Sequence, residues 1–231
     1  MNRHIIRAIH EYLKTHYTLT EITEQAYPIL EGICDSADAA EKIMEPLARF
    51  YREHWNSKDE NETWMTYQGK TYNAHGGKDN VITPENVREE GSRNGLLFSI
   101  HNHPSGLSIQ SDADINDMGL CNEKYMITVA RDGITITKNP SHDWDVRVGM
   151  KAINRWTDNL LSIIDETPEM QELDRHMLDY TDDEYMTQYE KIQYKWLNDG
   201  DNYNEQMDKL NRTYKDYGLP LETTHIMIRK W

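Results

Sequence analysis

The chain has 231 residues and a mass of 27.2 kDa, enough for one medium domain or a compact core with helical additions. It carries 25 Lys and Arg against 40 Asp and Glu, and a formal net charge of −15 would repel the phosphates of nucleic acid. No stretch reaches the roughly 18 apolar residues of a membrane span, and the first residues lack the apolar run of a signal peptide.

Only two cysteines occur, Cys34 and Cys121, and they lie far apart in the sequence. This usage fits neither a disulfide framework nor a cysteine-rich metal site. We therefore expect a cytoplasmic protein, in the producing cell or, for a viral protein, in a host cell.

Residues 1–57 are predicted to be helical, because apolar residues recur there at spacings of three and four. Thr18 with Glu21 matches a capping box that begins one helix, and Pro46 interrupts the pattern of a later one. The polar segment 56–61 then marks a boundary. These residues predict an N-terminal helical extension that ends at about residue 57.

The periodicity changes to that of strands after this boundary. Glycine-containing turns separate short alternating runs, which predicts two hairpins with a buried strand and a short helix between them. The expected strands cover residues 62–67, 70–73, 96–100, 125–130 and 134–137, and the helix covers 111–120.

Helices return from residue 143 onward, and residues 225–229 could form a terminal strand. The pattern predicts an α+β fold in three parts. Residues 1–57 form the helical extension, 58–140 the core, and 141–231 a C-terminal helical region.

The chemistry is concentrated in residues 99–114, SIHNHPSGLSIQSDAD. If His101 and His103 continue the preceding strand, both imidazoles lie on the same face. Ser111 would begin the next helix, and Asp114, one turn in, could point back at them. Two histidines and one carboxylate leave a tetrahedral position open, as in catalytic zinc sites.

Each part of this pattern also has an ordinary explanation. The chain has ten histidines, so one H-x-H is no surprise. Ser111-x-x-Asp114 is close to a plain capping box. Capping would not compete with a metal site, however, because it would fix the directions of both side chains.

The combination resembles the JAMM signature of the MPN+ (JAB) metalloprotease superfamily. That signature is a distant Glu, then H-x-H-P, six residues, and S-x-x-D. The segment 101–114 reproduces the spacing, and HNHPSG looks most like the RadC-type and phage-associated branches. The resemblance covers about residues 60–140. It implies an MPN/JAB-like mixed sheet, similar to that of cytidine deaminases, with flanking helices.

The resemblance also implies roles for single residues. His101, His103 and Asp114 would hold one Zn²⁺ per chain, and Ser111 would help to stabilise the oxyanion. A glutamate on an early strand would act as the base. Glu62 is our first choice and Glu60 the second, while an exposed carboxylate at a strand end remains the ordinary interpretation of Glu62.

The implied activity is zinc-dependent hydrolysis of a peptide or isopeptide bond in a protein or peptide substrate, with ubiquitin-like conjugates as one class. One alternative is a RadC-like or phage-assembly accessory protein that uses the fold for binding with little hydrolysis. A helical interaction protein with an incidental site is another. The oligomeric state is not predicted.

Overall fold

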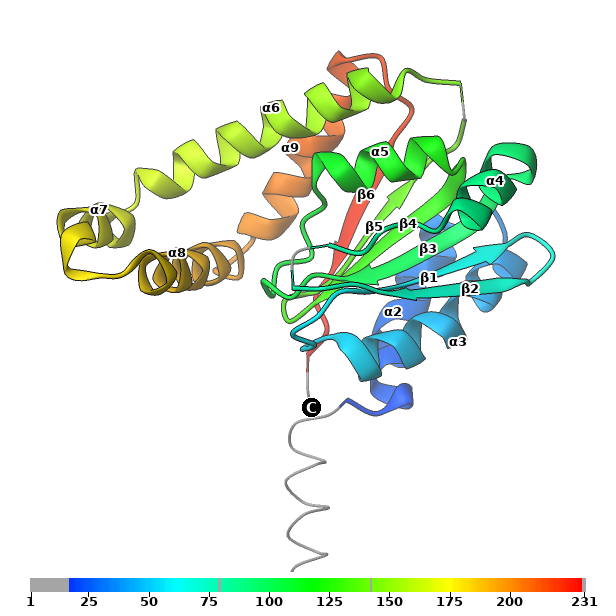
Figure 1. The fold of residues 1–231 in the computed structure, drawn as a ribbon, viewed down its shortest axis with the longest axis horizontal. Helices are drawn as coiled ribbons and strands as arrows, with labels where there is room; N and C mark the ends of the chain where they lie inside the picture. Colours follow the sequence, from blue (N-terminus) through cyan, green and yellow to red (C-terminus); the bar gives the residue numbers. More distant parts are fainter. Residues whose placement is uncertain (1–16, 79, 142, 230–231) are drawn as a thin grey trace, which may run out of the picture.

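The computed structural model describes residues 17–78, 80–141 and 143–229, which form an α+β fold around a six-stranded mixed sheet (Figure 1). The predicted α+β class is thus confirmed. The strand order is β2-β1-β3-β4-β5-β6, in which β3 and β4 are parallel and all other neighbours are antiparallel. The strands are β1 (Asn61–Thr66), β2 (Thr71–His75), β3 (Leu96–Asn102), β4 (Glu123–Ala130), β5 (Gly133–Lys138) and β6 (Glu222–Ile226).

Helices cover both faces of this sheet. Figure 1 shows α2 and α3 on one face and α5, α6 and α9 on the other. The helices are α2 (Leu19–Ile33), α3 (Ala37–His54), α4 (Glu85–Asn94), α5 (Asp112–Leu120), α6 (Val146–Asp165), α7 (Pro168–Arg175), α8 (Asp182–Leu197) and α9 (Asn202–Asp216). None of the described helices has the length and apolar character needed to cross a bilayer.

The first core lies between the sheet and the helices α2 and α3. Thr18 and Glu21 form the predicted capping box at the start of α2. Pro46 lies inside α3, yet that helix is continuous. Leu47 of α3 is fully buried in the same apolar cluster as Phe98 of β3. The two helices therefore share one core with the sheet.

The second core lies on the opposite face, where Met126 of β4 packs with Trp156 of α6 and Leu210 of α9 in one buried cluster. After α9 the chain returns to the sheet as β6, antiparallel to β5. This last strand begins three residues before the predicted 225–229. Helices α7 and α8 form an arm that projects from the body, and Leu197 is the one fully buried residue described in α8 (Figure 1).

Strand β3 lies in the middle of the sheet, and all seven of its residues are buried. It pairs His101 with Glu62 of β1 on one side and with Thr128 of β4 on the other. The chain leaves β3 at its carboxyl end, makes a loop over residues 103–111 and enters α5. This end of β3 is where the predicted chemistry is located.

Candidate metal centre

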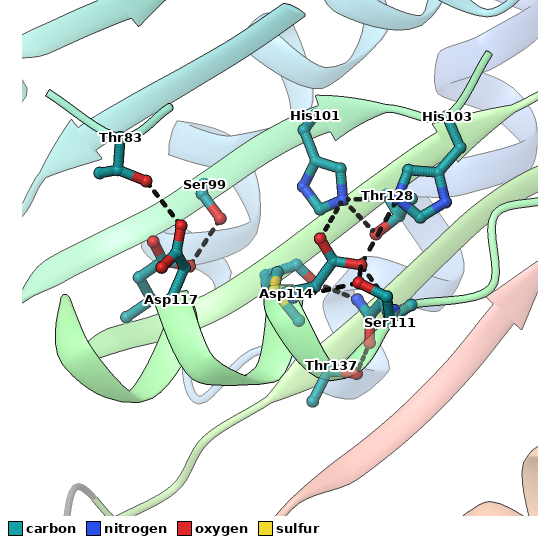
Figure 2. Close-up of polar contacts among 12 residues, drawn as sticks. Thr83, Ser99, His101, His103, Ser111, Asp114, Asp117, Thr128 and Thr137 are labelled. Carbon is teal, nitrogen blue, oxygen red and sulfur yellow. Dashed lines mark hydrogen bonds and ion pairs between the residues drawn. The ribbon is translucent and has the colours of Figure 1, made fainter. Parts of the chain in front are cut away.

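The end of β3 directs two imidazoles to the same side of the sheet. His101 is 3% exposed, and its Nε2 lies 3.2 Å from Nε2 of His103. His103 follows the last residue of the strand, but its backbone N–H still donates to the carbonyl of Val129 at 2.9 Å. This bond continues the strand pairing by one residue, and the alternation expected from the sequence is observed (Figure 2).

Asp114 faces these imidazoles from the first turn of α5 (Figure 2). Ser111 is the N-cap residue, and its hydroxyl accepts a bond from the Asp114 N–H at 3.3 Å. In return, Asp114 Oδ2 accepts bonds from the Ser111 N–H at 2.6 Å and from its hydroxyl at 2.9 Å. The capping box that starts the helix therefore also fixes the direction of the carboxylate.

These three side chains are spaced like the ligands of one metal ion. Asp114 Oδ1 lies 3.4 Å from His101 Nε2, and Asp114 Oδ2 lies 3.4 Å from His103 Nε2. Ligand atoms bonded to zinc at about 2.0–2.2 Å with tetrahedral angles lie about 3.3–3.6 Å apart. Each histidine therefore has one Asp114 oxygen at a ligand-like separation, the two distances involving the two different oxygens of the carboxylate, and His101, His103 and Asp114 are close enough to share a metal ion.

Hydrogen bonds also fix the orientation and the tautomer of the imidazole rings. Nδ1 of His103 lies 3.1 Å from the carbonyl oxygen of Leu107, which can only accept. His103 therefore carries its proton on Nδ1 and can direct a Nε2 lone pair toward the site. The hydroxyl of Thr128 lies 3.2 Å from Nε2 of His101 on the neighbouring strand.

Burial and neighbouring charges shift the pKa values of His101, His103 and Asp114 in different directions. Burial lowers the pKa of His101 to about 4, so this imidazole is neutral at pH 7. Burial also lowers the pKa of His103, but the bond and charge of Asp114 outweigh it and the net shift is upward. Burial raises the pKa of Asp114, and the two histidines more than reverse this, so the carboxylate is ionised.

Two glutamates approach the imidazoles: Glu62 lies in β1, and Glu60 is the residue just before that strand. Glu62 lies directly opposite His101 in the antiparallel register, so the two side chains share a face. Glu60 precedes it by one strand repeat. One carboxylate oxygen of Glu60 and one ring nitrogen from each of His101 and His103 lie within 4.8 Å of one another. Both glutamates are 8% exposed, so Glu62 is not the exposed strand-end carboxylate of the ordinary interpretation.

These groups line a cleft of about 380 Å³. Six carboxylates line it, against a single lysine, Lys78, among the described residues. Four come from the sheet and α5, one from the residue before β1, and Glu190 comes from α8, so the arm supplies part of one wall. The carboxylates are Glu60, Glu62, Asp114, Asp117, Glu123 and Glu190.

Two of these carboxylates accept hydrogen bonds from hydroxyls: Ser99 donates to Glu123 at 2.6 Å and Thr83 donates to Asp117 at 2.7 Å (Figure 2). Burial, reinforced by neighbouring carboxylates, raises the pKa of Glu123 to about 8 and that of Glu62 well above its ordinary value. Sequence reasoning missed Asp117, Glu123, Thr128 and the Leu107 carbonyl. The period-two spacing of Ser99 and His101 could have indicated a polar stripe on β3.

Comparison with known proteins does not assign a family or a function to this site. No protein-family model matches the chain, and searches of curated proteins and of solved structures also found no match.

Proposed function

We propose that this protein is a zinc-dependent hydrolase of the JAMM type, with an MPN/JAB-like core, that cleaves a peptide or isopeptide bond. The observation that carries the proposal is the convergence of His101, His103 and Asp114 at 3.2–3.4 Å in the wall of an open cleft. The sequence resemblance supports it, because the residues that converge are those of the signature. Two glutamates beside the imidazoles supply candidates for the base.

His101, His103 and Asp114 would hold the metal. When bound, zinc would act as a Lewis acid and lower the pKa of a coordinated water toward about 7. Glu62 of β1, or Glu60 just before it, would accept the proton of that water and later deliver it to the leaving amine. Ser111 lines the cleft next to Asp114, and its hydroxyl could turn to donate to the oxygen that develops negative charge.

Metal content tests the first half of the proposal. The purified protein should bind about one zinc per chain, as a three-ligand site predicts. His103→Ala and Asp114→Ala should lose it. His176→Ala is a matched control, because this exposed histidine also contacts two carboxylates, at 2.9 and 3.1 Å, and does not line the cleft. Zinc retained in both ligand variants, or lost equally in the control, would contradict the site.

A cleavage screen tests the second half. Zinc-loaded protein is incubated with quenched fluorescent peptides and with ubiquitin-like conjugates, and the Asp114→Ala variant serves as the inactive control. Cleavage by the wild type alone supports the hydrolase. Zinc binding without any cleavage would favour the accessory-protein alternative, for which a shift of labelled DNA at physiological salt is the next measurement. The charge of −15 disfavours that outcome.

A further inference from the structure

A buried polar cluster lies behind the loop that connects His103 to Ser111. We call it the support cluster. Its five members come from this loop, from the turn between β4 and β5, from β5, and from the C-terminal elements α9 and β6. They are Ser108, Asp132, Thr135, Tyr203 and His225, all between 0% and 8% exposed. None of them belongs to the JAMM signature.

Asp132 is the centre of the cluster. Its two carboxylate oxygens accept from the backbone N–H of Ser108 at 2.9 and 3.0 Å. Oδ2 also accepts from the hydroxyl of Tyr203 at 2.8 Å. The ring of Tyr203 stacks on His225 with 3.5 Å between centroids. A carboxylate that is 2% exposed is thus held by a loop amide on one side and by α9 on the other.

A single peptide group links this carboxylate to the metal centre. The Ser108 N–H that donates to Asp132 and the Leu107 carbonyl that faces His103 belong to the same peptide unit. All described peptide bonds are trans, so the N–H and C=O of this unit point in opposite directions. The hydrogen bonds therefore run from Tyr203 through Asp132 and the peptide to Nδ1 of His103.

Metal-binding histidines usually donate their second N–H to a carboxylate or a carbonyl, which fixes the ring and the tautomer. Here the carbonyl is itself polarised and oriented by a buried carboxylate. We infer that Asp132 and Tyr203 are positioning residues for His103, so that helix α9 supports the metal centre from about a hundred residues away in sequence. The inference rests on the metal centre proposed above.

The test uses the full chain, with Co²⁺ as a probe that reports both affinity and ligand geometry. Tyr203→Phe removes one hydroxyl, and Asp132→Asn weakens the same path at the carboxylate. Tyr125→Phe is the matched control. Its ring is also buried, and its hydroxyl accepts from the Asp35 N–H at 3.0 Å, but it packs in the core on the opposite face of the sheet.

We expect Tyr203→Phe and Asp132→Asn to weaken Co²⁺ binding about 10-fold or more, measured by competition with a chelator. Their visible d–d bands should also shift, whereas Tyr125→Phe should keep the wild-type affinity and spectrum. Wild-type binding in Tyr203→Phe, or an equal loss in Tyr125→Phe, would overturn the inference and leave the metal centre intact. No Co²⁺ or Zn²⁺ binding by the wild type would overturn the centre itself.

Discussion

Two glutamates one strand repeat apart compete for the role of base, and their positions predict different phenotypes. Glu62 lies opposite His101, while the Glu60 carboxylate lies near both imidazoles at once. Glu62→Gln should therefore keep the zinc and lose about 10²–10⁴-fold in kcat. Glu60→Gln should also weaken zinc binding, because its carboxylate and the two imidazoles form a group close enough together to hold a metal ion.

Zinc content and kcat of each variant, measured on the same preparation, separate these roles. Asn61→Ser, on the opposite face of β1 between them, is a control for damage to the strand. If Glu62→Gln kept full activity, Glu60 would instead be assigned the role of general base.

The buried carboxyl group of Glu123 should make the free energy of unfolding depend on pH. Burial raises its pKa to about 8, and Asp117 and Asp114 add to the shift. A carboxyl whose pKa is higher in the folded than in the unfolded chain stabilises the fold at low pH. That contribution is lost as the pH rises from about 4.5 to 8. The shift corresponds to roughly 3–5 kcal/mol of unfolding free energy.

The side chain introduced by Glu123→Gln stays neutral at every pH, and its amide oxygen can still accept the hydrogen bond from Ser99. In chelator-treated protein, the variant should therefore gain stability over the wild type between pH 5 and pH 9. Urea unfolding at both pH values measures this. A difference that does not change with pH would contradict the explanation.

At the scale of elements, the start of α5 has two functions. The capping box both begins the helix and directs Asp114 at the imidazoles. Ser111→Ala should cost about 1 kcal/mol of unfolding free energy and should also weaken zinc binding, because Asp114 loses one of its two fixed donors.

Ser111→Thr keeps a capping hydroxyl and should restore most of the stability and the zinc affinity. Urea unfolding of the metal-free protein measures the free energy of unfolding, and competition with a chelator measures the zinc affinity. If alanine lowered stability but left zinc affinity unchanged, the coupling between cap and ligand would be wrong.

Local rules explain which elements the sequence could predict. His101 and His103 obey the period-two rule of a strand, and Ser111 and Asp114 obey a four-residue capping rule, so both halves of the centre are visible in short windows. The same rule cannot separate Glu60 from Glu62, because residues two apart share a face. The support cluster was not predicted, since Tyr203 and Asp132 meet only through the packing of α9.

The terminal strand shows the same limit. The alternation near the C-terminus indicates a strand, but its register and bounds are set by pairing with β5, nearly 90 residues earlier. Pairing over such distances is a property of the whole sheet. The prediction therefore found the strand and misplaced it by three residues.

At the scale of the whole molecule, charge should select the substrate. The net charge is −15, and the cleft has six carboxylates against Lys78 among its described lining residues. Glu62 and Glu123 have raised pKa values and carry little of this charge near neutral pH, so the attraction for positive charge comes from the other carboxylates, including Glu190, and from the net charge. Peptides with Lys or Arg near the scissile bond should therefore show a higher kcat/KM than neutral ones, and the preference should fall as salt rises.

Charge reversals on the arm distinguish the effect of the charges in the cleft from the effect of the net charge of the protein. Glu190→Lys changes the cleft wall, while Glu172→Lys makes the same change on α7, at an exposed residue absent from that lining. We expect Glu190→Lys to reduce the preference for cationic peptides several-fold at low salt, with zinc affinity unchanged, and Glu172→Lys to have little effect. Equal effects would show that net charge alone attracts the substrate, and the arm would then have no part in recognition.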